Sequence, residues 1–352
     1  MYKEIKEIYD SFYDDKSKRI FINRFLNNLT GNRNYFINMI AENCKNVEGY
    51  NVEKYYRESS CEKKLIIYGA MISGKTRYDF HKYLGRDDIY CFCDKDVNKQ
   101  KNGFLGKKVI SPEELISEFK DYKVIIESKY YYDEIYKYLV ENDFPKDNII
   151  LHSINGCQYF DYEYMEFNDS EVMVDAGCYD CETIKIFKDK VKRYNKIIAL
   201  EPDKENYNNC IDIINKDKLE NIQLINAGLW NEHKILHFCG GENSDSKISD
   251  SGEETCEVFA LDDICKDEKV SFIKMDIEGS ELNAIKGAEK TIILNKPKLA
   301  ICVYHKNEDI LDIQEYLMKL VPEYRFGIRH YTDFMYETVL YAFVPKKMMG
   351  EN

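Results

Sequence analysis

The sequence lacks the features that would indicate export, membrane insertion or nucleic-acid binding. Its first residues, MYKEIKEIYDSFYDD, have neither the basic end nor the uninterrupted apolar stretch of a secretory signal. No later apolar run is long enough to span a bilayer, and no long basic block interrupts a formal net charge of −13. We therefore expect a cytoplasmic protein that acts on a small molecule, with no membrane and no nucleic acid among its partners.

A disulfide framework is a further feature that we do not expect. The chain has 12 cysteines, but without an export signal they are better interpreted as reduced thiols. Cys91 and Cys93 alternate in IYCFCD, as small apolar side chains do in a buried strand. Cys178 and Cys181 form a C-x-x-C pattern in a turn, which leaves a redox or metal role open. Because no second pair of ligands has matching spacing, we expect no bound metal.

The chain of 352 residues is long enough for two domains and a helical appendage. Residues 1–60 have apolar side chains at helical spacing, among them Ile5, Ile8 and Phe12, and the stretch TGNRN breaks the pattern. This segment carries no recognisable chemistry. We expect a helical cap or an interaction surface, for a partner or for a second copy of the chain.

Strands alternate with helices in the rest of the chain, which predicts an α/β fold with parallel strands and helices on both faces. One series covers residues 61–155 and predicts a Rossmann-like domain. A longer series follows in residues 156–352. Its last strand, TVLYAFVP, follows YRFGIRH without a helix between them. Such a pair is most simply antiparallel.

The stretch from Gly69 to Thr76 fits the phosphate-loop pattern G-x-x-x-x-G-K-[ST]. A working loop of that kind needs a partner strand ending in Asp, whereas KVIIES ends in Glu127. Asp94 suits the ribose-facing acid of a dinucleotide fold, but Met71 stands where that fold has its middle glycine. We interpret the stretch as a tight turn of a Rossmann-like domain. A bound nucleotide or nucleotide sugar, and ATP hydrolysis, are the alternatives.

Acids stand at the ends of three successive strands of the second series. They are Asp175 in EVMVDAG, Glu201 in IIALEPD, and Asp276 with Glu278 in IKMDIEG. A carboxylate at the end of the second strand can accept hydrogen bonds from both ribose hydroxyls of an adenosine. Gly177 would let the backbone approach that ligand. The carboxyl edge of this sheet is therefore the expected binding crevice.

These motifs resemble the FkbM-type methyltransferases from about Tyr159 to Pro345. The similar stretches, in the expected order, are VDAGCYDCET, EPDKENY, NAGLW, LDDI, FIKMDIEGSELNAIKGAEKTI, KPKLAICVYHK, RHY and ETVLYA. The resemblance implies a class I sheet of seven strands with an antiparallel last strand, and S-adenosylmethionine as the cofactor. Residues 64–155 are similar to the Rossmann-like domain often found before such methyltransferases. Cys181 stands where family members usually carry Gly, and its side chain would narrow the cofactor turn.

The cofactor site is expected at the carboxyl edge of this sheet. The residues assigned to it are Asp175, Gly177, Tyr179, Asp180, Glu201, Asn226, Ala227 and Asp276. Two other interpretations remain open. One is a nucleotide-sugar enzyme or binding protein without methyltransferase activity. The other is an idle binding module whose second sheet has lost its cofactor.

Catalysis would rest on His305, at the end of AICVYH, as a neutral base. Asp276 and Glu278 would orient the acceptor or hold the amino end of the methionine moiety. The residues expected to bind a polar, acidic or phosphorylated acceptor are Lys306, Arg329, His330 and Glu337. The alternative is that Arg329 and Glu337 pair with each other and only fix their strands.

The resemblance implies O-methylation of a sugar, a glycan or the hydroxyl of a small natural product. N-methylation of a small amine would fit the same cleft without a base. Glu281 is better interpreted as an acid at a helix start than as a catalyst.

Overall fold

The computed structural model describes residues 2–44, 51–57, 65–128, 130–151, 158–239, 247–248 and 254–346. The chain divides into two compact units. Unit 1 comprises Met1–Asn28, Gly156–Tyr331 and Met335–Asn352, and unit 2 comprises Leu29–Asn155 and Thr332–Phe334. Within the described residues, no helix is both long enough and apolar enough to cross a membrane.

Unit 1 is built on a seven-stranded sheet in the order β15-β16-β14-β13-β6-β7-β8. The strands are β6 (Val172–Ala176), β7 (Lys196–Leu200), β8 (Ile222–Ile225), β13 (Phe272–Met275), β14 (Lys298–Cys302), β15 (Arg325–His330) and β16 (Thr338–Phe343). The last strand, β16, is antiparallel to both of its neighbours. The predicted seven-stranded sheet with an antiparallel last strand is confirmed.

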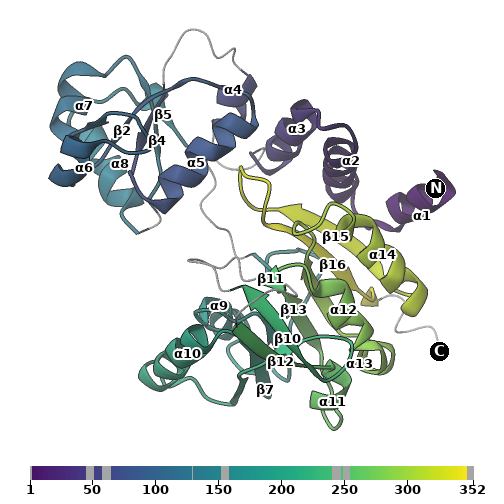
Figure 1. The fold of residues 1–352 in the computed structure, drawn as a ribbon. Helices are drawn as coiled ribbons and strands as arrows, with labels where there is room; N and C mark the ends of the chain where they lie inside the picture. The colour runs from purple at the N-terminus through teal and green to yellow at the C-terminus, as the bar shows by residue number, and fades with distance from the viewer. Residues whose placement is uncertain are drawn as a thin grey trace. The chain divides into compact units, whose positions relative to one another are not determined.

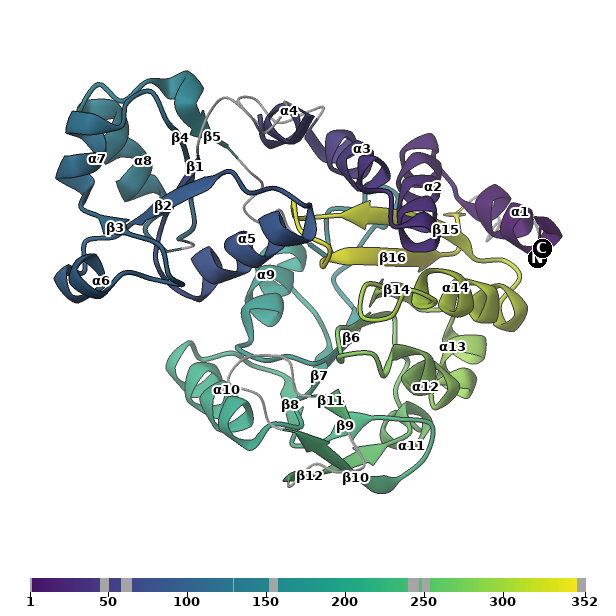
Figure 2. The same ribbon diagram turned by 45° about the horizontal axis from the view of Figure 1, so that its top comes forward.

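Helices cover both faces of this sheet, as Figures 1 and 2 show. On one face lie α9 (Glu182–Val191) and α10 (Lys204–Lys216), and on the other lie α12 (Glu281–Lys286), α13 (Glu289–Asn295) and α14 (Asp309–Leu320). The short helix α11 (Leu261–Ile264) precedes β13. Strands covered on both faces need apolar side chains throughout. This explains why β6 and β16 are buried along their whole length.

A small second sheet of unit 1 was not predicted from the sequence. It has the order β11-β10-β12-β9 and contains β9 (Gly228–Leu229), β10 (Lys234–Cys239), β11 (Lys247–Ile248) and β12 (Glu254–Phe259). It follows directly on β8 in the chain. Asn226 and Ala227, which were predicted to contact the cofactor, form the connection between β8 of the large sheet and β9 of the small one.

The helices before residue 60 divide between the two units. Helix α1 (Tyr2–Ser11) and nearly all of α2 (Asp15–Thr30) lie in unit 1, whereas α3 (Arg33–Cys44) and α4 (Val52–Arg57) lie in unit 2. Phe12 forms a β-bridge with Phe326 of β15, and Ser17 Oγ accepts a hydrogen bond of 2.9 Å from Ile328 N. The division into domains 1–60, 61–155 and 156–352 stays a prediction.

Unit 2 contains a parallel five-stranded sheet in the order β3-β2-β1-β4-β5, as predicted for a Rossmann-like domain. Its elements are β1 (Leu65–Tyr68), α5 (Ile72–Tyr83), β2 (Ile89–Cys93), α6 (Val97–Asn102), β3 (Val109–Ile110), α7 (Pro112–Glu118), β4 (Lys123–Ile126), α8 (Tyr132–Glu141), η1 (Lys146–Asn148) and β5 (Ile149–Ile150). Cys91 and Cys93 are buried in β2, which confirms their interpretation as core residues.

The phosphate-loop pattern forms the turn between β1 and α5. Gly69 has a φ of +121°, and a Cβ atom there would lie 2.4 Å from the carbonyl oxygen of Glu127. Ala70 N donates a hydrogen bond of 2.9 Å to Asp94 Oδ2, and Lys75 Nζ donates one of 2.7 Å to Asp79. Because the groups that would hold a phosphate or a ribose have local partners, these contacts favour the structural turn.

Candidate functional site

The carboxyl ends of the parallel strands of unit 1 meet at one edge of the sheet. Glu201 follows β7, Asp276 follows β13 and His305 lies just beyond β14, and these three strands and β6 run in the same direction. Because β16 is antiparallel, with Cys302 paired to Val339, its start comes to the same edge. Glu337, which the sequence places just before β16, therefore joins the three side chains predicted for the crevice.

Glu201 is held at this edge by two backbone amides. Its Oε2 accepts a hydrogen bond of 3.0 Å from Tyr179 N, and its Oε1 accepts one of 3.0 Å from Asp203 N. Burial raises the pKa of Glu201. A carboxylate has about four lone-pair positions, so two further acceptor positions remain for the hydroxyls of a ribose. The donor set therefore fits the adenosine half of the implied cofactor.

The turn after β6 requires Gly177. This residue has a φ of +77°, and a Cβ atom there would lie 2.0 Å from the carbonyl oxygen of Asp276. Asp175 does not reach the edge, because it is fully buried in β6 with Oδ1 at 3.1 Å from Lys274 Nζ. Lys274 Nζ in turn donates a hydrogen bond of 2.6 Å to the carbonyl oxygen of Gly177. Asp175 thus supports the turn from beneath.

The other predicted cofactor residues follow β6 and β8, the two strands that flank β7. Tyr179 is 51% exposed and has a φ of +46°, and Asp180 Oδ1 accepts a hydrogen bond from Glu182 N at the start of α9. Asn226 is exposed, and its Nδ2 donates a hydrogen bond of 2.8 Å to the carbonyl oxygen of Glu201. Ala227 is buried. Their roles toward the cofactor stay predictions.

The predicted catalytic residues Asp276, Glu278 and His305 have ligand atoms within 4.8 Å of one another. His305 Nε2 lies 3.5 Å from Asp276 Oδ1 and 3.4 Å from Glu278 Oε2, and its Nδ1 lies 3.0 Å from Glu281 Oε1. The His305 side chain is only 7% exposed. The sequence predicted the first three residues together and assigned Glu281 to the helix start.

The surrounding carboxylates change the expected state of His305. Burial acts to lower its pKa, but the hydrogen bond and charge of Glu281, with the charges of Asp276 and Glu278, outweigh burial and raise the pKa to about 9. The imidazole is therefore mostly protonated at neutral pH, which differs from the neutral base expected from the sequence. A base role for His305 then requires alkaline pH or a charge change on ligand binding.

Two tyrosines and a second acid adjoin Asp276. Tyr159 Oη donates a hydrogen bond of 2.9 Å to Asp276 Oδ2, and Tyr304 Oη donates one of 3.0 Å to Oδ1. Glu337, Cys302 and Asp276 form a further group within 4.8 Å. Burial and the charge of Asp276 raise the pKa of Glu337 to about 7. Tyr304 directly precedes His305 in the chain, which was the available signal, whereas Tyr159 carried none.

The predicted acceptor residues separate into two groups. Lys306 is exposed and Glu337 half-buried, at the same edge as His305, and Lys306 Nζ donates a hydrogen bond to the carbonyl oxygen of Gly279. Arg329 and His330 are buried, and His330 Nδ1 lies 2.9 Å from Thr338 Oγ1. Their roles in acceptor binding stay predictions.

Arg329 pairs with acids of the unit other than Glu337. Its Nη1 donates to Asp14 Oδ1 at 3.3 Å, and its Nη2 donates to Glu163 Oε1 at 3.0 Å. Glu337 instead accepts a hydrogen bond from Gln158 Nε2. Arg329 and Glu337 therefore do not pair with each other. Arg329 is instead tied to Asp14 and Glu163, which would still allow it to fix its strand.

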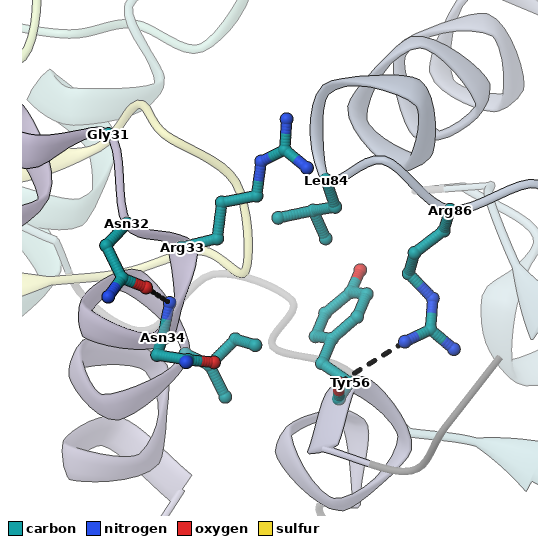
Figure 3. Close-up of a pocket in the computed structure, with 8 residues that line it drawn as sticks. Gly31, Asn32, Arg33, Asn34, Tyr56, Leu84 and Arg86 are labelled. Atoms are coloured by element: carbon teal, nitrogen blue, oxygen red, sulfur yellow. Dashed lines mark hydrogen bonds between the residues drawn. The ribbon is translucent and has the colours of Figure 1, made fainter.

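A pocket in unit 2 shares no residue with this edge of the sheet. Figure 3 shows the residues that line it, with Arg33 and Arg86 among them. Arg86 Nη1 donates a hydrogen bond of 3.3 Å to the carbonyl oxygen of Tyr56, and its Nε donates one of 2.7 Å to Asp88. The charge of Arg86 is therefore already compensated, and the pocket is not the candidate active site.

Family models match both α/β parts of the chain. The Methyltransferase FkbM domain matches residues 175–328, and a family described as C2185-like, N-terminal, matches residues 61–150. The first match covers the strands that carry Glu201, Asp276 and His305. No curated protein matched the chain.

The chain was also compared with solved structures, and one of them shares its fold. The chain is similar to a methyltransferase FkbM from Methylobacillus flagellatus, with 21% identity and a TM-score of 0.52, over 90% of this chain and 100% of that one. An rRNA methylase from Streptococcus thermophilus aligns with 15% identity and a TM-score of 0.35, over 51% of this chain and 88% of that one. The first similarity supports the α/β architecture described above.

Proposed function

We propose, from the premise that residues 175–328 are a methyltransferase FkbM domain, that this methyltransferase methylates a hydroxyl group of a sugar, a glycan or a small natural product. The methyl donor is S-adenosylmethionine, which supplies an electrophilic methyl group when bound. Glu201 would hold the ribose, and the turn from Gly177 to Asp180 would approach the rest of the donor. The acids at the sheet edge suit its positive charge.

The observation that carries this proposal is the group of titratable side chains beside the donor residues. His305 lies 3.4 Å from Glu278 and 3.5 Å from Asp276, and Glu337 joins Asp276 at the same edge. A hydroxyl group must lose its proton as it attacks, whereas a neutral amine needs no base. A crevice with two candidate bases therefore favours a hydroxyl acceptor over an amine.

The direct test is mass spectrometry of a cell extract incubated with the protein and methyl-labelled S-adenosylmethionine. A labelled ether product would identify the acceptor and the methylated oxygen together. A labelled amine would replace the proposal by N-methylation. Equilibrium binding of S-adenosylmethionine against NAD provides the companion measurement, because a protein that binds only NAD would belong to the nucleotide-sugar interpretation.

Replacing Glu201 by Gln should weaken the binding of S-adenosylmethionine. Gln keeps the shape of the side chain but loses the charge, and a hydrogen bond to a charged group contributes about 1.5 to 3 kcal/mol, so the Kd should rise about 10- to 100-fold. Calorimetric titration measures this change. Glu205→Gln, at an exposed position on α10, is the matched control, and equal affinities for the two variants would contradict the role of Glu201.

Donor binding should also change the fluorescence of Trp230. This residue is the single tryptophan of the chain and follows Asn226 by one short strand. Its ring lies beneath Lys234 Nζ, at 4.9 Å from the ring centroid, so movement of this segment would alter its surroundings. We expect a saturable change with S-adenosylmethionine and none with NAD. An unaltered spectrum at a saturating concentration of S-adenosylmethionine would contradict the binding of its adenine near Asn226.

A further inference from the structure

Three buried cysteines meet beside the turn that follows β6. Cys178 follows Gly177 in that turn, Cys181 directly precedes α9, and Cys210 lies on α10. Their sulfur atoms lie within 4.8 Å of one another, and the Cys178 and Cys210 sulfurs are 3.8 Å apart. None of the three is more than 2% exposed. The proposed methyl transfer uses none of these thiols.

The backbone brings the three side chains together from separate elements. Cys181 N donates a hydrogen bond of 2.8 Å to the carbonyl oxygen of Cys178, which closes the turn. Cys181 itself has a φ of +58°, a conformation that favours glycine. When the surrounding structure holds a residue other than glycine at a positive φ, the strain is often connected with a function. The Cys181 side chain places its thiol close to those of Cys178 and Cys210.

The spacing of the sulfurs matches that of thiolates on one metal ion. Two thiolates on a tetrahedral zinc ion lie about 3.8 Å apart, because each Zn–S bond is about 2.3 Å long. The Cys178–Cys210 separation of 3.8 Å equals this distance. The third sulfur lies within 4.8 Å of both, so small side-chain rotations would bring it to the same ion.

One of the three thiols also stands at the start of a helix. Cys181 is the N-cap of α9, a helix of 10 residues whose first N–H groups favour negative charge. A soft cation with an affinity for sulfur suits such a set better than magnesium or calcium.

We propose that Cys178, Cys181 and Cys210 bind a soft divalent cation of the zinc type, with a water molecule as the fourth ligand. Each S–H bond is replaced by a sulfur–metal bond, and the protons pass to the solvent without any change of oxidation state. The C-x-x-C pattern of Cys178 and Cys181 left a metal role open, but the third ligand, Cys210, could not be predicted because it lies on a helix beyond β7. The ion would join the turn, α9 and α10, and it would stabilise unit 1.

The test is a titration of the reduced, metal-free protein with Cd²⁺, followed by the ultraviolet charge-transfer absorption of cadmium thiolates. We expect saturation at an equimolar ratio. Cys178→Ser, Cys181→Ser and Cys210→Ser should each weaken the affinity by more than about 100-fold, because each removes a direct ligand. Cys265→Ser replaces a buried thiol outside the cluster and should bind like the unchanged protein. Circular dichroism checks that each variant is folded.

A second measurement does not depend on the variants. X-ray absorption of the zinc-loaded protein should give three sulfur ligands at about 2.3 Å and one lighter ligand. Fewer than three sulfur ligands would overturn the proposal. So would cadmium binding that Cys265→Ser weakens as much as Cys210→Ser does. A disulfide joining two of the three cysteines, mapped by mass spectrometry in protein purified without reductant, would overturn it as well.

Discussion

His305→Ala should lower the rate of methyl transfer by about 100- to 10,000-fold at alkaline pH, the range that a positioned base contributes. With the unchanged protein, kcat/KM should rise with pH and level off above about 9, the value to which Glu281, Asp276 and Glu278 raise the pKa of His305. The direction follows from the chemistry, because only the deprotonated imidazole can accept a proton. In the His305→Ala variant, kcat/KM should not show this rise with pH.

Donor binding should move the step toward lower pH. A cation placed beside an imidazolium disfavours its charge, so the pKa of His305 in the donor complex should lie below about 9. The profile of kcat reports groups in the complex, whereas kcat/KM reports the free protein. We therefore expect the step in kcat at lower pH than the step in kcat/KM. The two profiles can be measured in the same series of reactions.

Glu337 provides the competing assignment. Burial and the charge of Asp276 raise its pKa to about 7, so a reaction that uses Glu337 as the base would rise through about 7 instead. In that case Glu337→Gln would abolish the rise of the rate with pH, whereas His305→Ala would retain it. This result would reject His305 as the base. His233→Ala, at an exposed histidine paired with Glu257, is the matched control and should leave both the rate and the profile unchanged.

Most of the fold could be predicted from local sequence patterns. Alternating strands and helices predicted both mainly parallel sheets, because short apolar runs, typical of strands buried on both faces, are separated by segments with helical spacing. The absence of a helix between YRFGIRH and TVLYAFVP predicted the antiparallel strand β16. The small sheet of β9 to β12 was missed. Two of its strands, β9 and β11, have only two residues each, and β12 (ETCEVF) is rich in polar residues, so the sheet shows no strong apolar pattern.

The site was predictable where one strand end supplies one residue. Glu201, Asp276 and His305 each follow a strand, and the direction of the parallel strands brings them to one edge. Side-chain partners could not be predicted in the same way. Arg329 pairs with Asp14, and Asp175 pairs with Lys274, across large separations in sequence. Such pairs depend on the packing of whole elements, and so does the protonated state of His305.

The same limit applies to Arg77 in unit 2, which no sequence motif singled out. Arg77 is fully buried on α5, and its Nε donates a hydrogen bond of 2.6 Å to Glu127 Oε1. Its Nη1 lies 2.5 Å from Asp333 Oδ2, and its guanidinium carbon lies 4.1 Å from the ring centroid of Phe334. Asp333 and Phe334 belong to the short segment Thr332–Phe334 of this unit.

Arg77→Met should lower the free energy of unfolding of unit 2 by about 3 to 5 kcal/mol, because it leaves the carboxylates of Glu127 and Asp333 buried without their cation. Hydrogen exchange of the amides of β1 and β4 measures this change. Lys75→Met, which removes the exposed pair with Asp79 on the same helix, should change it by less than about 1 kcal/mol.

Neutralising the whole group tests the cause of that loss. Arg77→Met combined with Glu127→Gln and Asp333→Asn removes every charge of the cluster, and neutral replacements of a buried ion group often cost little. We expect the triple variant to recover most of the stability that Arg77→Met loses. If the triple variant is no more stable than Arg77→Met, the loss comes from the missing packing on Phe334, and the unpaired charges are not its cause.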